Sequence, residues 1–166
     1  MDILAKAILH QKYKFECFDK RGRLKWEEEV ENLVVTVGRN KYLDATLKTG
    51  LASPAWYVGL KGAGTPAAAD TMASHTSWAE ITPYSNAVRP TFTPGTIADG
   101  SINNSGSRAT FNVNAATTVY GGFMIDKNAK AGTTGTLLGA SDFASARAVE
   151  SGDTLYVTIT CSITAA

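Results

Sequence analysis

The residues that most often carry metal or nucleophile chemistry are few in this chain and stand far apart. His10 and His75 are isolated from each other, and Cys17 and Cys161 lie near opposite ends of the chain. A metal site requires clustered His, Cys or carboxylate ligands, which this spacing does not supply. No Gly-x-Ser-x-Gly elbow occurs, so nothing local indicates a Ser-His-Asp triad. We therefore expect no metal, no cofactor and no catalytic residue, and predict that the chain is not an enzyme.

Four carboxylates are the remaining candidates for acid–base chemistry: Asp126, Asp142, Glu150 and Asp153. A suitably separated pair would serve glycan cleavage, and the separation of two carboxyl groups is a property of the fold that sequence alone does not give. Each of the four stands beside small or turn-forming residues, which favours a role in turns. A glycan-cleaving enzyme is therefore kept only as a remote third hypothesis.

Two glycine-rich segments superficially match nucleotide-binding loops. Residues 62–67, Gly-Ala-Gly-Thr-Pro-Ala, have the spacing of a dinucleotide fingerprint, but Pro66 interrupts the turn and no crossover helix with a parallel strand is predicted after it. Residues 132–139 lack the lysine that a phosphate-binding loop needs. Neither segment predicts nucleotide binding.

The overall charge also argues against two classes of partner. The formal net charge of +1 creates no field that would gather nucleic acid or an anionic membrane. No apolar run approaches transmembrane length, and the first fifteen residues lack the basic and unbroken apolar regions of a signal peptide. We expect neither nucleic-acid nor membrane binding, synthesis in a cytosol, and two cysteines that stay reduced in the core.

Charge is concentrated at the N-terminal end, where residues 1–50 carry 10 of the 16 Lys and Arg residues. Aromatic and charged residues alternate over 13–18, an Asp-Lys-Arg-Gly-Arg turn follows, and apolar and charged residues alternate again over 24–30. This pattern predicts a β-hairpin in which Lys12 and Lys14 oppose the run from Glu27 to Glu29. We interpret residues 1–31 as a charged N-terminal hairpin or arm, and residues 32–166 as the main domain.

One helix is predicted near residues 33–48. Its evidence is a capping Asn32, a terminal Gly50, and a helical stripe formed by Leu33, Val37, Leu43 and Leu47. Gly38 within the stripe weakens a helix by about 1 kcal/mol relative to Ala.

After Gly50 the apolar period changes from helical spacing to two, which predicts strands. The expected strands include Trp56, Val58 and Leu60; an edge strand over 88–93 that carries Pro90; residues 109–113; residues 118–125; and residues 155–164. Gly121 and Gly122 suggest a bulge or a close backbone approach. Residues 62–86 and 126–152 are expected to be long connections. The fold class is mainly β: an antiparallel β-sandwich or jelly-roll-like domain with an N-terminal hairpin and one helix.

Several segments resemble small structural proteins of tailed bacteriophages, either head decoration (cement) proteins or tail-associated proteins. The likeness covers most of residues 31–163 and is carried by Glu31-Asn32-Leu33-Val34, Val37-Gly38, Trp56-Tyr57-Val58-Gly59-Leu60, Ala69-Asp70-Thr71-Met72-Ala73-Ser74-His75, Trp78, Glu80, Tyr84-Ser85, Arg89-Pro90, Gly135-Thr136-Leu137-Leu138-Gly139, Asp142-Phe143 and Ser151-Gly152-Asp153-Thr154-Leu155. The hairpin matches least well.

This resemblance implies a structural protein of the virion, made in the cytoplasm of the bacterial host and without active-site residues. The first hypothesis is a capsid decoration protein that forms a dimer or trimer and binds the major capsid protein. The alternative is a tail or fibre adhesin that touches a host glycan through residues 62–86 and 99–107. The partner-binding residues expected for the first hypothesis lie in the hairpin: Tyr13, Phe15, Phe18, Arg21, Arg23 and Trp26.

Overall fold

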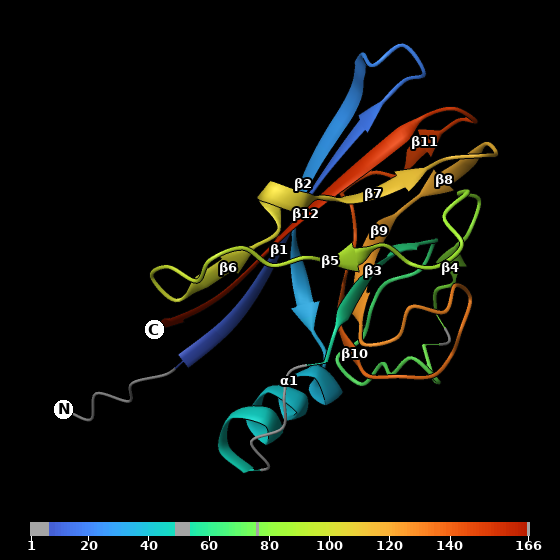
Figure 1. Ribbon diagram of the computed structural model, residues 1–166. Coiled ribbons are helices and arrows are strands. Elements are labelled where there is room, and N and C mark those ends of the chain that lie inside the picture. Colours follow the sequence, from blue (N-terminus) through green and yellow to red (C-terminus); the bar gives the residue numbers. More distant parts are fainter. Residues whose placement is uncertain (1–6, 49–53, 76, 166) are drawn as a thin grey trace.

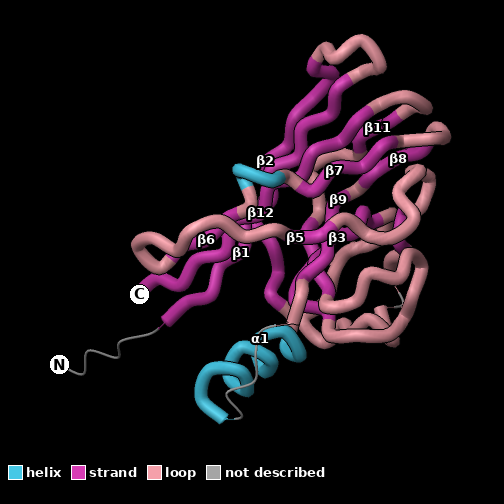
Figure 2. The backbone as a smooth tube through the Cα atoms, in the orientation of Figure 1, coloured by secondary structure: helices cyan, strands magenta, loops and turns pink. Residues whose placement is uncertain are grey.

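The computed structural model describes residues 7–48, 54–75 and 77–165. Antiparallel sheets curl into a half-barrel, with one helical segment at its lower end (Figure 1). The prediction of a mainly β, sandwich-like domain is confirmed. Strands dominate the backbone, and several of the longer loops lie together on the right of the view (Figure 2).

The elements, in chain order, are β1 (Ala7–Phe18), β2 (Leu24–Val34), α1 (Thr36–Leu43), the π-helical η1 (Asp44–Lys48), β3 (Trp56–Lys61), β4 (Glu80–Ile81), β5 (Thr91–Phe92), β6 (Ser101–Asn103), the short 3-10 turn η2 (Ser105–Ser107), β7 (Ala109–Asn112), β8 (Thr117–Val119), β9 (Gly121–Ile125), β10 (Leu137–Ser141), β11 (Arg147–Val149) and β12 (Thr154–Ala165). The main sheet has the strand order β4-β3-β9-β10-β2-β1-β12-β6, with β5 beside β3 and β7 beside β12. Strands β8 and β11 form a separate pair.

The first and last strands form the longest pair in the sheet. β1 runs antiparallel to β12 over its whole length, from Ala7 opposite Ala165 to Phe18 opposite Thr154. Alternate side chains of both strands face the core, because successive residues of a strand point to opposite faces. Tyr13, Phe15 and the facing Val157 are completely buried there. The alternating pattern predicted for β12 is thus confirmed.

The hairpin formed by β1 and β2 belongs to the main sheet. Its predicted cross-strand charge pairing is confirmed, since Lys12 contacts Glu29 and the Lys14 amine lies 3.4 Å from the Glu27 carboxylate. The interpretation of residues 1–31 as an appended arm is nevertheless wrong for its described part. The physical reason is that one face of β1 supplies the core, which a detached arm would leave exposed.

The predicted helix begins too early. Residues up to Val34 continue β2, which pairs with β10, and Asn32 lies opposite Ser141 in that ladder. Asn32 therefore does not cap the helix, and the residue at the cap position, Val35, makes no side-chain capping bond. Pairing with β10 and burial of Val34 and Val35 outweigh the helical spacing. The predicted terminal residue Gly50 lies outside the described residues.

Two central strands of the main sheet, β9 and β10, are buried on both faces. Met124 of β9 packs in the larger core cluster between the curled sheets, whereas its neighbours Phe123 and Ile125 pack in a second cluster with Val35 and Trp78. The predicted strand over 118–125 is divided, because β8 turns away to pair with β11. A Cβ at Gly121 would lie 1.9 Å from the carbonyl oxygen of Ser141, which confirms the predicted close approach.

The long segments expected to be plain connections are held down by buried ions. Arg89 is completely buried and its guanidinium donates to both carboxylate oxygens of Glu80, at 3.0 and 2.6 Å, and to the carbonyls of Lys127 and Gly132. Buried Lys61 donates to the carbonyls of Gly62 and Gly64. The expectation for residues 126–152 is wrong in part, since that segment contributes β10 and β11.

Phe15→Ala should lower the free energy of unfolding by about 3–5 kcal/mol, because it removes a fully buried aromatic ring from the core. Phe18→Ala is the matched control: Phe18 is only half-buried, so its loss should be clearly smaller. Urea unfolding followed by tryptophan fluorescence measures both. Equal, small losses for the two variants would contradict the assignment of β1 to the core.

Candidate functional site

The six hairpin residues predicted to bind a partner fall into three groups. Tyr13 and Phe15 have no exposed surface, so their assignment as contact residues is wrong: the period-two pattern of β1 turns them into the core. Burial raises the pKa of Tyr13 well above its ordinary value, which keeps the phenol neutral. These two residues shape the fold and offer no surface to a partner.

Phe18 and Trp26 are half-buried and hold the hairpin to the rest of the sheet. The Phe18 ring meets Tyr156 edge-on at a centroid distance of 5.6 Å. Trp26 packs edge-on against Phe143 at 5.9 Å, and its indole N–H donates to the carbonyl of Ala148 at 3.1 Å.

Arg21 and Arg23 lie on the exposed tip of the hairpin, as expected for contact residues. The tip is ordered by Asp19, whose carboxylate accepts hydrogen bonds from the backbone N–H of Arg21 at 2.8 Å and of Arg23 at 3.0 Å. The Arg23 side chain adds a third bond at 2.8 Å. The hydrogen bonds from Arg23, backbone first, lower the pKa of Asp19 to about 2. Gly22 supplies the positive φ of 75° that closes the turn.

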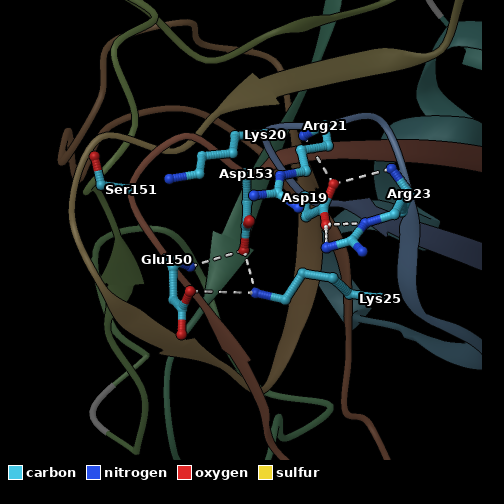
Figure 3. Close-up of a pocket in the computed structure, with 8 residues that line it drawn as sticks. All are labelled: Asp19, Lys20, Arg21, Arg23, Lys25, Glu150, Ser151 and Asp153. Carbon is cyan, nitrogen blue, oxygen red and sulfur yellow. Dashed lines mark hydrogen bonds and ion pairs between the residues drawn. The ribbon is translucent and has the colours of Figure 1, made fainter.

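Below this tip is a polar hollow of about 450 Å³ (Figure 3). Its lining residues are Asp19, Lys20, Arg21, Arg23, Lys25, Glu150, Ser151 and Asp153. Lys25 Nζ donates to Asp153 Oδ2 at 2.7 Å, and this hydrogen bond raises the pKa of Lys25. Lys20 and Arg21 have no side-chain partner among the described residues, so they are the two cations at this tip that remain available to an outside group.

The carboxylates considered for catalysis all make structural contacts. Asp126 accepts the N–H of Thr136 at 2.7 Å, and Asp142 pairs with the buried Lys61. Asp153 accepts the N–H of Glu150 at 2.8 Å and closes the turn before β12. Glu150 and Asp153 share the polar hollow, but Lys25 stands between them.

The two thiols are buried and free, as predicted. Burial, followed by the charge of Asp153, raises the pKa of Cys17 to about 12. Burial raises the pKa of Cys161 to about 11. Both thiols therefore stay protonated near neutral pH, a state with little nucleophilic character.

The described residues contain no group of three or more His, Cys, Asp or Glu side chains placed to hold a metal ion. Over the same ranges, none of the helical segments combines the length and the apolar character needed to cross a bilayer.

A second hollow lies where β1 and β2 separate, and sequence reasoning missed it. This fork groove has a volume of about 700 Å³ and is lined by Ala7, Ile8, Leu9, Asn32, Leu33, Val34, Arg39, Tyr42, Leu43 and Ile163. Four apolar members are strongly exposed: Ile8 at 39%, Leu33 at 39%, Leu43 at 57% and Ile163 at 52%. Solitary exposed apolar residues are ordinary, but a group gathered around one hollow marks an interaction site.

One sequence signal does point to the fork groove. Residues 7–11, Ala-Ile-Leu-His-Gln, contain no Lys, Arg, Asp or Glu, whereas the rest of β1 alternates with charged residues. A loss of charge at the start of an otherwise charged strand is unusual for a surface exposed only to water.

No protein-family model matches the chain, and no curated protein sequence matches it.

Lys25→Met should lower the free energy of unfolding by about 1–3 kcal/mol, because it leaves the buried carboxylate of Asp153 without its cation. Lys25→Met combined with Asp153→Asn should recover most of this loss, since an amide oxygen still accepts the Glu150 N–H. Arg23→Met, which breaks an exposed pair, should have the smaller effect. Urea unfolding at pH 7 measures all three. A double variant as unstable as Lys25→Met would contradict the assignment.

Proposed function

We propose that the chain is a structural protein of a tailed-bacteriophage particle: a capsid decoration protein that associates with its own copies and binds the major capsid protein. The fork groove is the observation that carries the proposal. It presents four exposed apolar side chains around a hollow that no described segment of the chain fills. A cluster of exposed apolar side chains of this kind is typical of a surface that binds a protein partner. The sequence resemblance to phage structural proteins is the reason for proposing a phage particle as the assembly.

The arrangement of charges supports binding over catalysis. The carboxylates that were candidates for acid–base chemistry serve as turn and ion-pair partners, and the two that share the polar hollow, Glu150 and Asp153, both face Lys25. Buried ions such as Arg89 and Lys61 fix loops onto the sheet. These contacts give a rigid scaffold with ordered surfaces, which is what a shell-covering subunit needs.

The hairpin tip follows the last residue of β1, whereas Ala7, Ile8 and Leu9 at the start of β1 line the fork groove. At about 3.3 Å per residue, the strand separates them by roughly 30 Å. One subunit is therefore able to engage two neighbours simultaneously. In the proposal the cationic tip contacts the capsid shell and the groove contacts another copy, so repeated weak contacts sum around the shell.

Lys20→Glu with Arg21→Glu should weaken binding to undecorated capsids about 10-fold or more, because it reverses the two unpaired charges at the tip. Lys127→Glu is the control, since it reverses an exposed charge on the distant β9–β10 connection. Co-sedimentation with capsids, repeated at two salt concentrations, measures the affinities. Absence of binding by the unaltered protein would contradict the proposed function. Equal binding by the tip variant and the unaltered protein would show that the tip does not contact the capsid.

A further inference from the structure

The fork groove forms because β1 serves two different neighbours. From Lys12 onward β1 is paired on both sides, by β12 and by β2. Beyond Glu31, β2 crosses over to β10, where Asn32 to Val34 pair with Gly139 to Ser141. The edge of β1 over residues 7–11 that faces away from β12 therefore has no strand beside it among the described residues.

The apex of the fork is closed by side chains in place of backbone pairing. The amide of Asn32 donates to Gln11 Oε1 and to the Tyr13 hydroxyl, the latter at 3.3 Å. Gln11 is completely buried, and its amide donates to the sulfurs of Met124 and Cys161 at 3.7 and 3.5 Å. Asn32 Oδ1 is buried without a partner among the described residues. Side-chain hydrogen bonds thus hold the fork in place, and at its apex Asn32 Oδ1 accepts no hydrogen bond from the described residues.

The open edge carries none of the usual protection against strand addition. Proteins commonly protect an edge with Lys, Pro or a bulge. Residues 7–11 contain no proline and no charged residue, and their pairing with β12 shows no break in register. The charges of β1 begin at Lys12, where β2 already covers the edge. Residues 7–11 are therefore both the part of β1 without charged residues and the part without a neighbouring strand on this edge.

We propose that a second copy of this chain occupies the fork groove, and that the two copies pair their β1 edges antiparallel about a twofold axis near Leu9. This deepens the proposed function by naming the surface of its self-association. A twofold contact uses the same patch on both copies and closes on itself. In this register Leu9 lies opposite Leu9 of the second copy, and Ile8 lies opposite His10, so the paired segment of residues 7–11 brings no Lys, Arg, Asp or Glu from either copy.

A second copy fits this site better than an extended segment of another protein. Its edge is already held straight by β12 along all of residues 7–11, so little conformational entropy is lost on pairing. Each copy also brings its own exposed Ile8, Leu43 and Ile163 to the groove. One symmetric contact thus buries the apolar side chains of the groove and gives hydrogen-bond partners to the unpaired backbone edge.

Ile8→Lys tests the walls of the groove. It should raise the dissociation constant of the dimer about 100-fold, because each copy would bring one lysine into an apolar contact. Ile97→Lys is the control, since Ile97 is 71% exposed and does not line the fork groove. Sedimentation equilibrium of the unaltered chain and both variants measures the constants, and circular dichroism checks that each is folded.

Leu9→Cys tests the register. Directly opposed residues of antiparallel strands have Cα atoms about 4.5–5.5 Å apart, which suits a disulfide. Mild oxidation should convert this variant to a covalent dimer on a non-reducing gel, whereas Ile97→Cys should stay monomeric. The buried native thiols should not contribute.

The inference is overturned if the unaltered chain is monomeric at high concentration, if Ile8→Lys dimerises as tightly as Ile97→Lys, or if Leu9→Cys fails to cross-link within a dimer. These outcomes are separable from failure of the proposed function. A dimer that does not bind capsids contradicts the decoration role and leaves the β1 contact in place. A monomer that binds capsids contradicts the β1 contact and leaves the decoration role in place.

Discussion

The pairing of the first strand with the last is the contact on which the rest of the structure depends. It joins residues 7–18 to residues 154–165, so nearly the whole chain is the loop that this contact closes. Closing such a loop costs entropy, which is offset by burial of the alternating apolar side chains of both strands. Once β1 is fixed against β12, the hairpin brings β2 alongside, and β2 carries the chain across to β10.

The same constraint creates both candidate surfaces. β1 extends past its ladder with β2 only at its N-terminal end, which leaves residues 7–11 as an open edge, while the turn after Phe18 forms the hairpin tip. The tip is ordered by Asp19 and rests on the ion pair of Lys25 with Asp153. The open edge is walled by the end of β2 and by α1, which places apolar side chains around unpaired backbone. A single strand thus links a polar surface to an apolar one.

Sequence periodicity predicted those elements that have one face in the core and one face outside. β12 and the Lys12–Glu29 pairing followed from alternation, because each such strand keeps a strict period of two. β10 was missed because all five of its residues are buried, so no alternation is visible. The start of the helix was misplaced because pairing of Asn32 with β10 is a contact between segments more than 100 residues apart.

The candidate site was only partly predictable for a related reason. Exposure of Arg21 and Arg23 follows from a turn sequence, whereas burial of Tyr13 and Phe15 depends on distant core residues such as Phe143, which packs against Phe15. The fork groove is lined by residues from three segments that are far apart in the sequence, so no local sequence pattern indicates it. Its one sequence signal, the lack of charge over residues 7–11, gains meaning only when the open edge is known.

Amide hydrogen exchange along β1, followed by mass spectrometry at several protein concentrations, tests most directly whether this strand is both a core strand and an interface. The account predicts that amides of residues 12–18 are protected at every concentration, while protection of residues 7–11 rises as the concentration of the protein increases. Protection of residues 7–11 that does not change with concentration would contradict the interface. Rapid exchange over residues 12–18 would contradict the fold on which it depends.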